Sequence, residues 1–89
     1  MKQNKTTKKA IQMIASSNNI TGHHISFQDD LDIEYVNKNP EEDDIVIMGK
    51  NNTIFLEDFE KAIIVGNTIR VSNYILHIKW DSSYLLFLP

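Results

Sequence analysis

The spacing of apolar side chains divides the chain into one helix at its start and a series of short strands after it. In residues 5–17, apolar side chains recur at steps of three and four, with lysines on the opposite side. This spacing predicts an amphipathic helix. Asn4 or Thr6 is expected to cap the start of the helix. Residues 1–4 are polar, and we expect them to fray.

After Gly22, the period of the apolar positions shortens to two, which is typical of strands. Residues 31–35 alternate most clearly. The apolar residues of this segment are expected on one face of a strand: Leu31, Ile33 and Tyr35. Its acidic residues are expected on the other face: Asp30, Asp32 and Glu34.

Further short apolar segments are bounded by turn residues, and each predicts a strand. They are residues 25–27, 45–48, 53–56, 62–65, 68–71, 74–80 and 84–88. Gly66 and Asn67 separate two of these segments and predict a two-residue hairpin with a type II′ turn. Residues 57–62 fit a helical turn or a strand, and residues 37–42 predict a mobile polar loop.

One helix followed by short strands predicts an α+β fold of a single domain spanning residues 1–89. We expect the N-terminal helix to pack on a small antiparallel β-meander. Residues 84–88 are apolar at every position, so both faces of that strand are expected to be covered. A strongly bent sheet or a small barrel would cover both faces.

Composition excludes several classes of protein. The chain has no cysteine, so it has no disulfide framework, no thiolate nucleophile and no cysteine-bound zinc. No apolar stretch has the length of a membrane span, and we expect a cytoplasmic protein. The chain contains 13 isoleucines, 9 asparagines and 8 lysines but one arginine, a bias that suggests an AT-rich bacterial or phage genome.

Charge is distributed very unevenly along the chain. Residues 29–60 contain eleven of the twelve acidic residues and only two lysines, Lys38 and Lys50. If the fold gathers these carboxylates on one surface, the surface would attract basic partners. The candidate partner-binding residues are Asp30, Asp32, Glu34, Glu41, Glu42, Asp43 and Asp44. The alternative is a solvated strand face whose charges protect an edge from aggregation.

No motif for catalysis or metal binding is present. The alternating acids from Asp30 to Glu34 lack the glycine of a calcium loop. The histidines, His23, His24 and His77, lack the spacing of a chelating pair. The chain has neither a Gly-x-Ser-x-Gly segment nor a glycine-rich phosphate loop. We therefore expect no enzymatic activity, no cofactor and no metal.

These observations favour a non-enzymatic protein–protein interaction module with an acidic face. In its sharpest form, the chain is a small phage or bacterial regulator or inhibitor that binds the basic surface of a nucleic-acid-binding protein. One alternative is a small nucleic-acid-binding barrel that uses the lysines of residues 2–9 and the aromatic residues of the last two predicted strands, 74–80 and 84–88. The net charge of −3 argues against direct nucleic-acid binding. A second alternative is a structural assembly subunit that pairs through residues 84–88.

Overall fold

The computed structural model describes residues 4–27 and 29–80. In chain order, the elements are α1 (Lys5–Ala15), β1 (Asn19–His24), β2 (Ile33–Val36), η1 (Pro40–Glu42), β3 (Ile45–Gly49), β4 (Thr53–Phe55), η2 (Leu56–Lys61), β5 (Ile63–Val65), β6 (Thr68–Val71) and β7 (Tyr74–Lys79). The two η elements are 3₁₀ helices. The predicted α+β class is confirmed, with the N-terminal helix packed on antiparallel strands.

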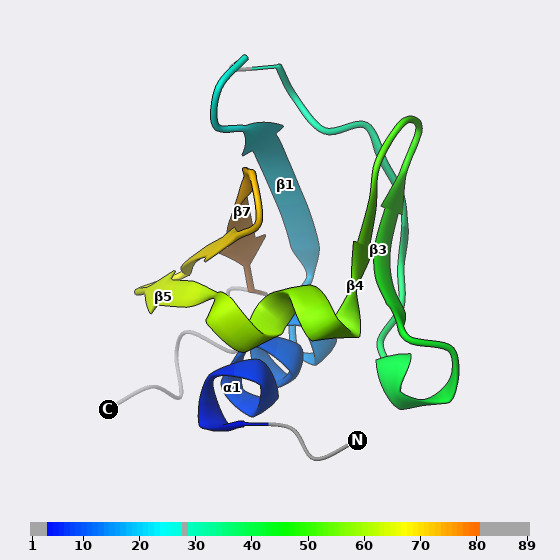
Figure 1. Cartoon of the computed structure of the whole chain (residues 1–89), viewed down its shortest axis with the longest axis vertical. Coiled ribbons are helices and arrows are strands. Elements are labelled where there is room, and N and C mark those ends of the chain that lie inside the picture. The colour runs from blue at the N-terminus through cyan, green and yellow to red at the C-terminus, as the bar shows by residue number, and fades with distance from the viewer. Residues whose placement is uncertain (1–3, 28, 81–89) are drawn as a thin grey trace.

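The strands form two separate antiparallel sheets. The four-stranded sheet has the order β1-β7-β6-β5, and the three-stranded sheet has the order β2-β3-β4. The sheets face each other, and α1 and η2 lie across one end of the space between them (Figure 1). The sheets are not closed into a barrel, because β1 and β2 are edge strands of different sheets. The predicted strand at 84–88 lies outside the described residues.

Both ends of α1 are fixed by long-range side-chain contacts. Asn4 caps the start: its Oδ1 accepts a hydrogen bond from Thr7 N at 2.8 Å, and its Nδ2 donates to Glu60 O at 3.0 Å. At the other end, Lys38 Nζ donates to Ile14 O at 3.0 Å and to Ser17 O at 2.8 Å. An ammonium at this end also offsets the negative pole of the helix dipole.

The local predictions for the turns have mixed outcomes. The hairpin at Gly66 is confirmed, with that glycine at φ +60 and its flanking strands paired. The predicted strand at 25–27 is wrong, because the chain turns there and Ile25 N donates to Asn73 O at 2.8 Å. Residues 57–62, which fitted either a helical turn or a strand, lie mostly in η2. Its first turn is closed by Asp58, whose Oδ2 accepts from Phe55 N at 2.8 Å.

One core joins the two sheets and both covering helices. The four-stranded sheet contributes Ile20, Ile69, Val71, Leu76 and Ile78, and the three-stranded sheet contributes Val46, Ile47 and Ile54. Helix α1 contributes Ala10, Met13 and Ile14, while Leu56, Phe59 and Ala62 come from η2 and the residue after it. Phe59 is fully buried. Since every layer contributes to the same cluster, the sheets are expected to unfold together.

Candidate functional site

An irregularity in β2 redirects one of its side chains. Ile33 pairs with Gly49 of β3, but Tyr35 pairs with Met48, so the register shifts between them. Ile33 packs against the core, while Tyr35 is exposed. The expectation that Tyr35 shares a face with Ile33 is therefore wrong. A bulge adds one residue to the strand and reverses the faces after it.

A second irregularity in β3 has a similar effect. The register with β4 shifts between Ile45 and Ile47. As a result, Val46 and Ile47 are both buried although they are adjacent, and Met48 returns to the outer face. The outer face of the three-stranded sheet therefore carries three exposed large apolar side chains: Tyr35 (48% exposed), Met48 (38%) and Phe55 (42%).

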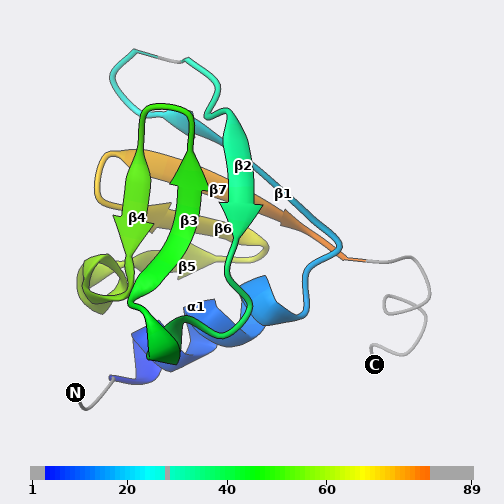
Figure 2. The same cartoon turned by 90° about the vertical axis from the view of Figure 1, so that its right-hand side faces the viewer.

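These three side chains lie on the same face of three neighbouring strands. Tyr35 is the cross-strand partner of Met48, and Met48 is the partner of Thr53. Phe55 follows Thr53 by two residues and is therefore on the same face. Figure 2 presents this sheet toward the viewer, with the four-stranded sheet behind it. The sequence did not predict this cluster, because the alternation of apolar residues contains no signal for the two bulges.

Three of the predicted partner-binding residues line one groove. Asp30, Asp32 and Glu34 are exposed and lie along a groove of about 580 Å³ between β1 and β2. Apolar side chains form part of its lining: Ile20, Leu31 and Ile33. The structure therefore places a row of exposed carboxylates along a groove that has apolar residues in its lining.

Two other predicted residues lie in a different hollow. Asp43 and Asp44 line a space of about 430 Å³ with Phe55, Leu56 and Glu57. Glu57 was not among the predicted site residues, and it joins them because β4 ends beside the start of β3. Asp43 also has a structural role, since its Oδ1 accepts from Asn37 Nδ2 at 2.7 Å. This hydrogen bond accounts for the position of the Asp43 carboxylate without a binding partner.

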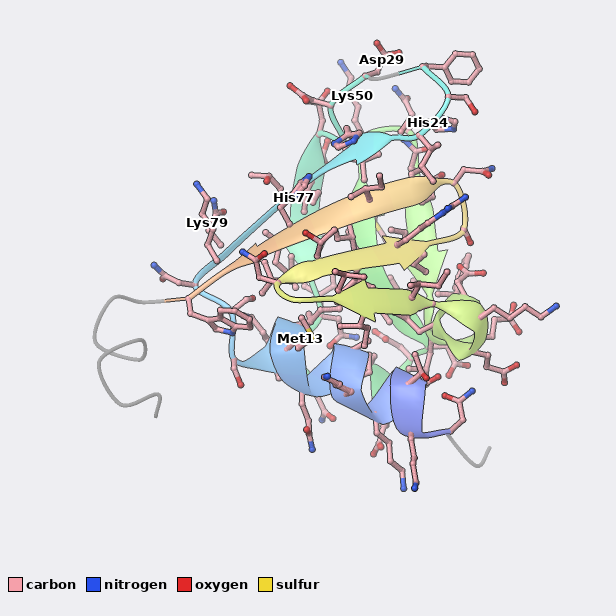
Figure 3. The ribbon with its side chains drawn as sticks, turned by 90° about the vertical axis from the view of Figure 1, so that its left-hand side faces the viewer. Met13, His24, Asp29, Lys50, His77 and Lys79 are labelled. Atoms are coloured by element: carbon pink, nitrogen blue, oxygen red, sulfur yellow. The ribbon has the colours of Figure 1, made fainter. Side chains whose placement is uncertain are left out.

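The remaining predicted site residues, Glu41 and Glu42, are in η1, where Glu41 is exposed. The structure thus divides five of the seven predicted residues between two hollows, and Glu41 lines neither. Both hollows border the three-stranded sheet, whose strands contain no lysine or arginine. Of the two lysines in residues 29–60, Lys38 is bound to the end of α1. Lys50 lies at the end of the molecule away from α1 (Figure 3), where its backbone N–H donates to Asp32 O at 3.0 Å.

The four-stranded sheet has the opposite charge. Its strands contain no aspartate or glutamate, and two exposed cations, Arg70 and Lys79, lie on them. His23 and His77 stack on this sheet with ring centroids 5.4 Å apart (Figure 3 labels His77 and Lys79). This outer face differs from that of the three-stranded sheet in both charge and polarity.

Within residues 4–27 and 29–80, no group of three or more histidine, aspartate or glutamate side chains is arranged to hold a metal ion. None of the helices in this part of the chain is long and apolar enough to cross a membrane. In comparisons with known proteins, no family model, no curated protein and no solved structure matches this chain.

Proposed function

We propose that this chain is a non-enzymatic protein–protein interaction module that binds a basic protein surface through the outer face of its three-stranded sheet. The observation that carries the proposal is the exposed cluster of Tyr35, Met48 and Phe55, bordered by carboxylates. Tyrosine, phenylalanine and methionine are enriched in the centres of protein interfaces, where charged residues are depleted, and the rims are polar. The cluster and its acidic border have this composition.

The free energies involved indicate why the interface needs both the apolar cluster and its acidic border. Burying an apolar side chain of this size contributes about 1.5–3 kcal/mol. Association costs about 4–15 kcal/mol in lost translational and rotational freedom. Three partly exposed side chains therefore do not give tight binding alone. Complementary charges add specificity and a faster association rate.

The charges at the border define the chemistry of the partner. Glu34 is exposed on the edge strand beside Tyr35, and Asp44 and Glu57 lie in the hollow beside Phe55. A matching surface has an apolar centre ringed by lysine or arginine. In the sharper form of the proposal, this surface belongs to a nucleic-acid-binding protein of a bacterium or phage. The carboxylates take the positions of phosphates there, and the chain acts as an inhibitor.

Direct nucleic-acid binding has less support. That alternative needs exposed aromatic side chains on which bases stack. Tyr74 is half-buried and its hydroxyl donates to Asn52 Oδ1 at 2.9 Å, while Trp80 packs against the core. The other two aromatic residues of that alternative, Tyr84 and Phe87, lie outside the described residues. The assembly-subunit alternative depends on residues 84–88, which lie outside the described residues.

The proposal is tested by affinity capture from a lysate of the organism that encodes the chain. Replacing the apolar centre (Tyr35→Ser with Phe55→Ser) is expected to abolish capture of the partner. Charge reversal at the border (Glu34→Lys with Glu57→Lys) is expected to weaken capture and to flatten its salt dependence. Reversal on the opposite sheet (Arg70→Glu with Lys79→Glu) is the matched control and should leave capture unchanged.

Retention of the partner by the Tyr35→Ser, Phe55→Ser variant would contradict the proposal. A gel-shift assay at low salt with single-stranded DNA and RNA distinguishes the proposal from direct nucleic-acid binding. The proposal expects no shift, whereas the nucleic-acid model requires one.

A further inference from the structure

A second exposed apolar patch lies on the four-stranded sheet. Its centre is formed by Ile63 and Val65, which occupy alternate positions of β5 and are more than half exposed. The β5–β6 pairing places Ile63 opposite Arg70, so these two side chains share a face of the sheet. Ile63 also lines a hollow of about 370 Å³ together with Lys5 and Lys9 of α1. We call these five residues the β5 patch.

The charge around the β5 patch is positive. Lys5, Lys9 and Arg70 are exposed, and so is Lys61, which precedes β5 by two residues. Glu60 is the acidic residue closest to β5 in the sequence, and the four cations outnumber its one carboxylate. Because β5 is the edge strand of its sheet, the cations border it from two different elements, β6 and α1.

The β5 patch has the composition that the three-stranded sheet requires of a partner. The cluster of Tyr35, Met48 and Phe55 is bordered by carboxylates, so its complement is an apolar centre bordered by cations. The cluster lies on three neighbouring strands about 4.8 Å apart, which makes it about 10 Å across. Ile63 and Val65 are separated by about 6.5–7 Å along one strand. The two apolar centres are therefore similar in size, and the charges around them are opposite.

The β5 patch and the apolar cluster face in opposite directions. Figure 2 presents the three-stranded sheet, and Figure 3 presents the four-stranded sheet from the opposite side. A two-fold dimer would set like against like, carboxylates against carboxylates or lysines against lysines, and such contacts are unfavourable. A head-to-tail contact instead sets each patch against its complement and leaves one of each free at the two ends.

We infer that copies of this chain associate head to tail, with the β5 patch of one copy on the cluster of Tyr35, Met48 and Phe55 of the next. The inference rests on the same cluster as the proposed function and adds a second copy of this chain as a further partner. Both centres are much smaller than the roughly 20–30 residues a side of a standard interface, so we expect a dissociation constant of about 0.1–1 mM. At about 1 µM chain, no more than about 1% of copies are then associated. The contact forms in concentrated chain and does not compete with capture of a tighter partner from a dilute lysate.

The test is sedimentation velocity of the full chain at low salt, from about 10 µM to about 1 mM, a range that includes the expected dissociation constant. Two variants each remove one apolar centre: Tyr35→Ser with Phe55→Ser on the three-stranded sheet, and Ile63→Ser with Val65→Ser on β5. Phe27→Ser is the matched control, because Phe27 is as exposed as Val65 and belongs to neither patch.

The wild-type chain is expected to form species larger than a dimer as its concentration rises, because a head-to-tail contact does not stop at two copies. Each double serine variant alone should associate at least about tenfold more weakly. An equimolar mixture of the two should form a dimer and nothing larger, since each variant supplies the patch that the other lacks. Phe27→Ser should associate as the wild-type chain does.

A charge variant, Lys5→Glu with Lys9→Glu, tests the same contact without altering its apolar residues. The helix dipole favours acidic residues in the first turns of α1, so the fold is retained. The charge variant should associate at least about tenfold more weakly, and added salt should weaken association of the wild-type chain. A wild-type chain that stays monomeric, a limit at the dimer, no complex in the mixture, or undiminished association of the charge variant would overturn the inference.

The Ile63→Ser, Val65→Ser variant separates this inference from the proposed function. It keeps the cluster of the three-stranded sheet, so it should still capture the partner from a lysate although it no longer associates with itself. Self-association without capture would contradict the proposed function alone. Capture without self-association would contradict the head-to-tail contact alone.

Discussion

The two sheets of this molecule have equivalent inner faces and contrasting outer faces. Each directs isoleucine and valine into one shared core. Outside, the four-stranded sheet carries His23, Arg70, His77 and Lys79 and no acidic residue. The three-stranded sheet carries an apolar cluster bordered by carboxylates. The shared core is built from the inner faces, and the proposed interface depends on the difference between the outer faces.

An exposed apolar residue is not by itself a sign of an interface. Ile63 and Val65 are 55% and 70% exposed and share one face of β5, the edge strand of the four-stranded sheet. Exposed aliphatic side chains are common on monomers. Tyr35, Met48 and Phe55 differ because two of them are aromatic and because acidic residues border them. The two outer faces therefore differ in that only the three-stranded sheet combines an apolar centre that contains aromatic residues with an acidic border.

The largest expected effects test whether the two inner faces are equivalent. Ile54 and Ile69 are buried in the three-stranded and four-stranded sheets, respectively. Replacing either one with alanine should lower the free energy of unfolding by about 2–5 kcal/mol, because a cavity forms in the shared core. Urea denaturation followed by circular dichroism and by Trp80 fluorescence should show one transition in both variants. Two separate transitions would show that the sheets are independent units.

A smaller effect tests the role of the lysines near the acidic residues. Lys38→Met removes the ammonium that Ile14 O and Ser17 O accept from, and should lower the free energy of unfolding by about 1–2 kcal/mol. The matched variant Lys50→Met should change it by less than about 0.5 kcal/mol, as expected of an exposed substitution. Thermal unfolding of both variants measures the difference. Equal effects would mean that Lys38 is not a structural cap.

The smallest effect compares two residues with left-handed backbone. Ser72, in the β6–β7 turn, has φ 51, and Asp44, before β3, has φ 63. Glycine adopts such angles without steric cost, so Ser72→Gly and Asp44→Gly should each stabilise the fold by about 0.5 kcal/mol. Only Asp44→Gly is expected to weaken partner capture, because it removes a border carboxylate. Equal capture by both variants would show that Asp44 is not part of the interface.

Local interactions account for what the sequence predicted correctly. The helical spacing of residues 5–17 and the glycine at 66 act over a few residues, and both predictions are confirmed. Tyr35 was assigned to the wrong face because a bulge depends on how two strands pair. The role of Lys38 was not predictable either, since its partner Ile14 is 24 residues away. The acidic row was found from sequence, but the groove that it lines needs β1 beside β2.

Site-specific photo-crosslinking tests the central claim most directly. A photoreactive phenylalanine analogue is placed at Tyr35 on the three-stranded sheet, or at Arg70 on the four-stranded sheet as the control. After irradiation in a lysate of the encoding organism, the probe at Tyr35 is expected to give a discrete adduct that diminishes as salt increases. The probe at Arg70 should give none. An adduct from Arg70 alone, or equal adducts from both positions, would contradict the assignment of the interface to the three-stranded sheet.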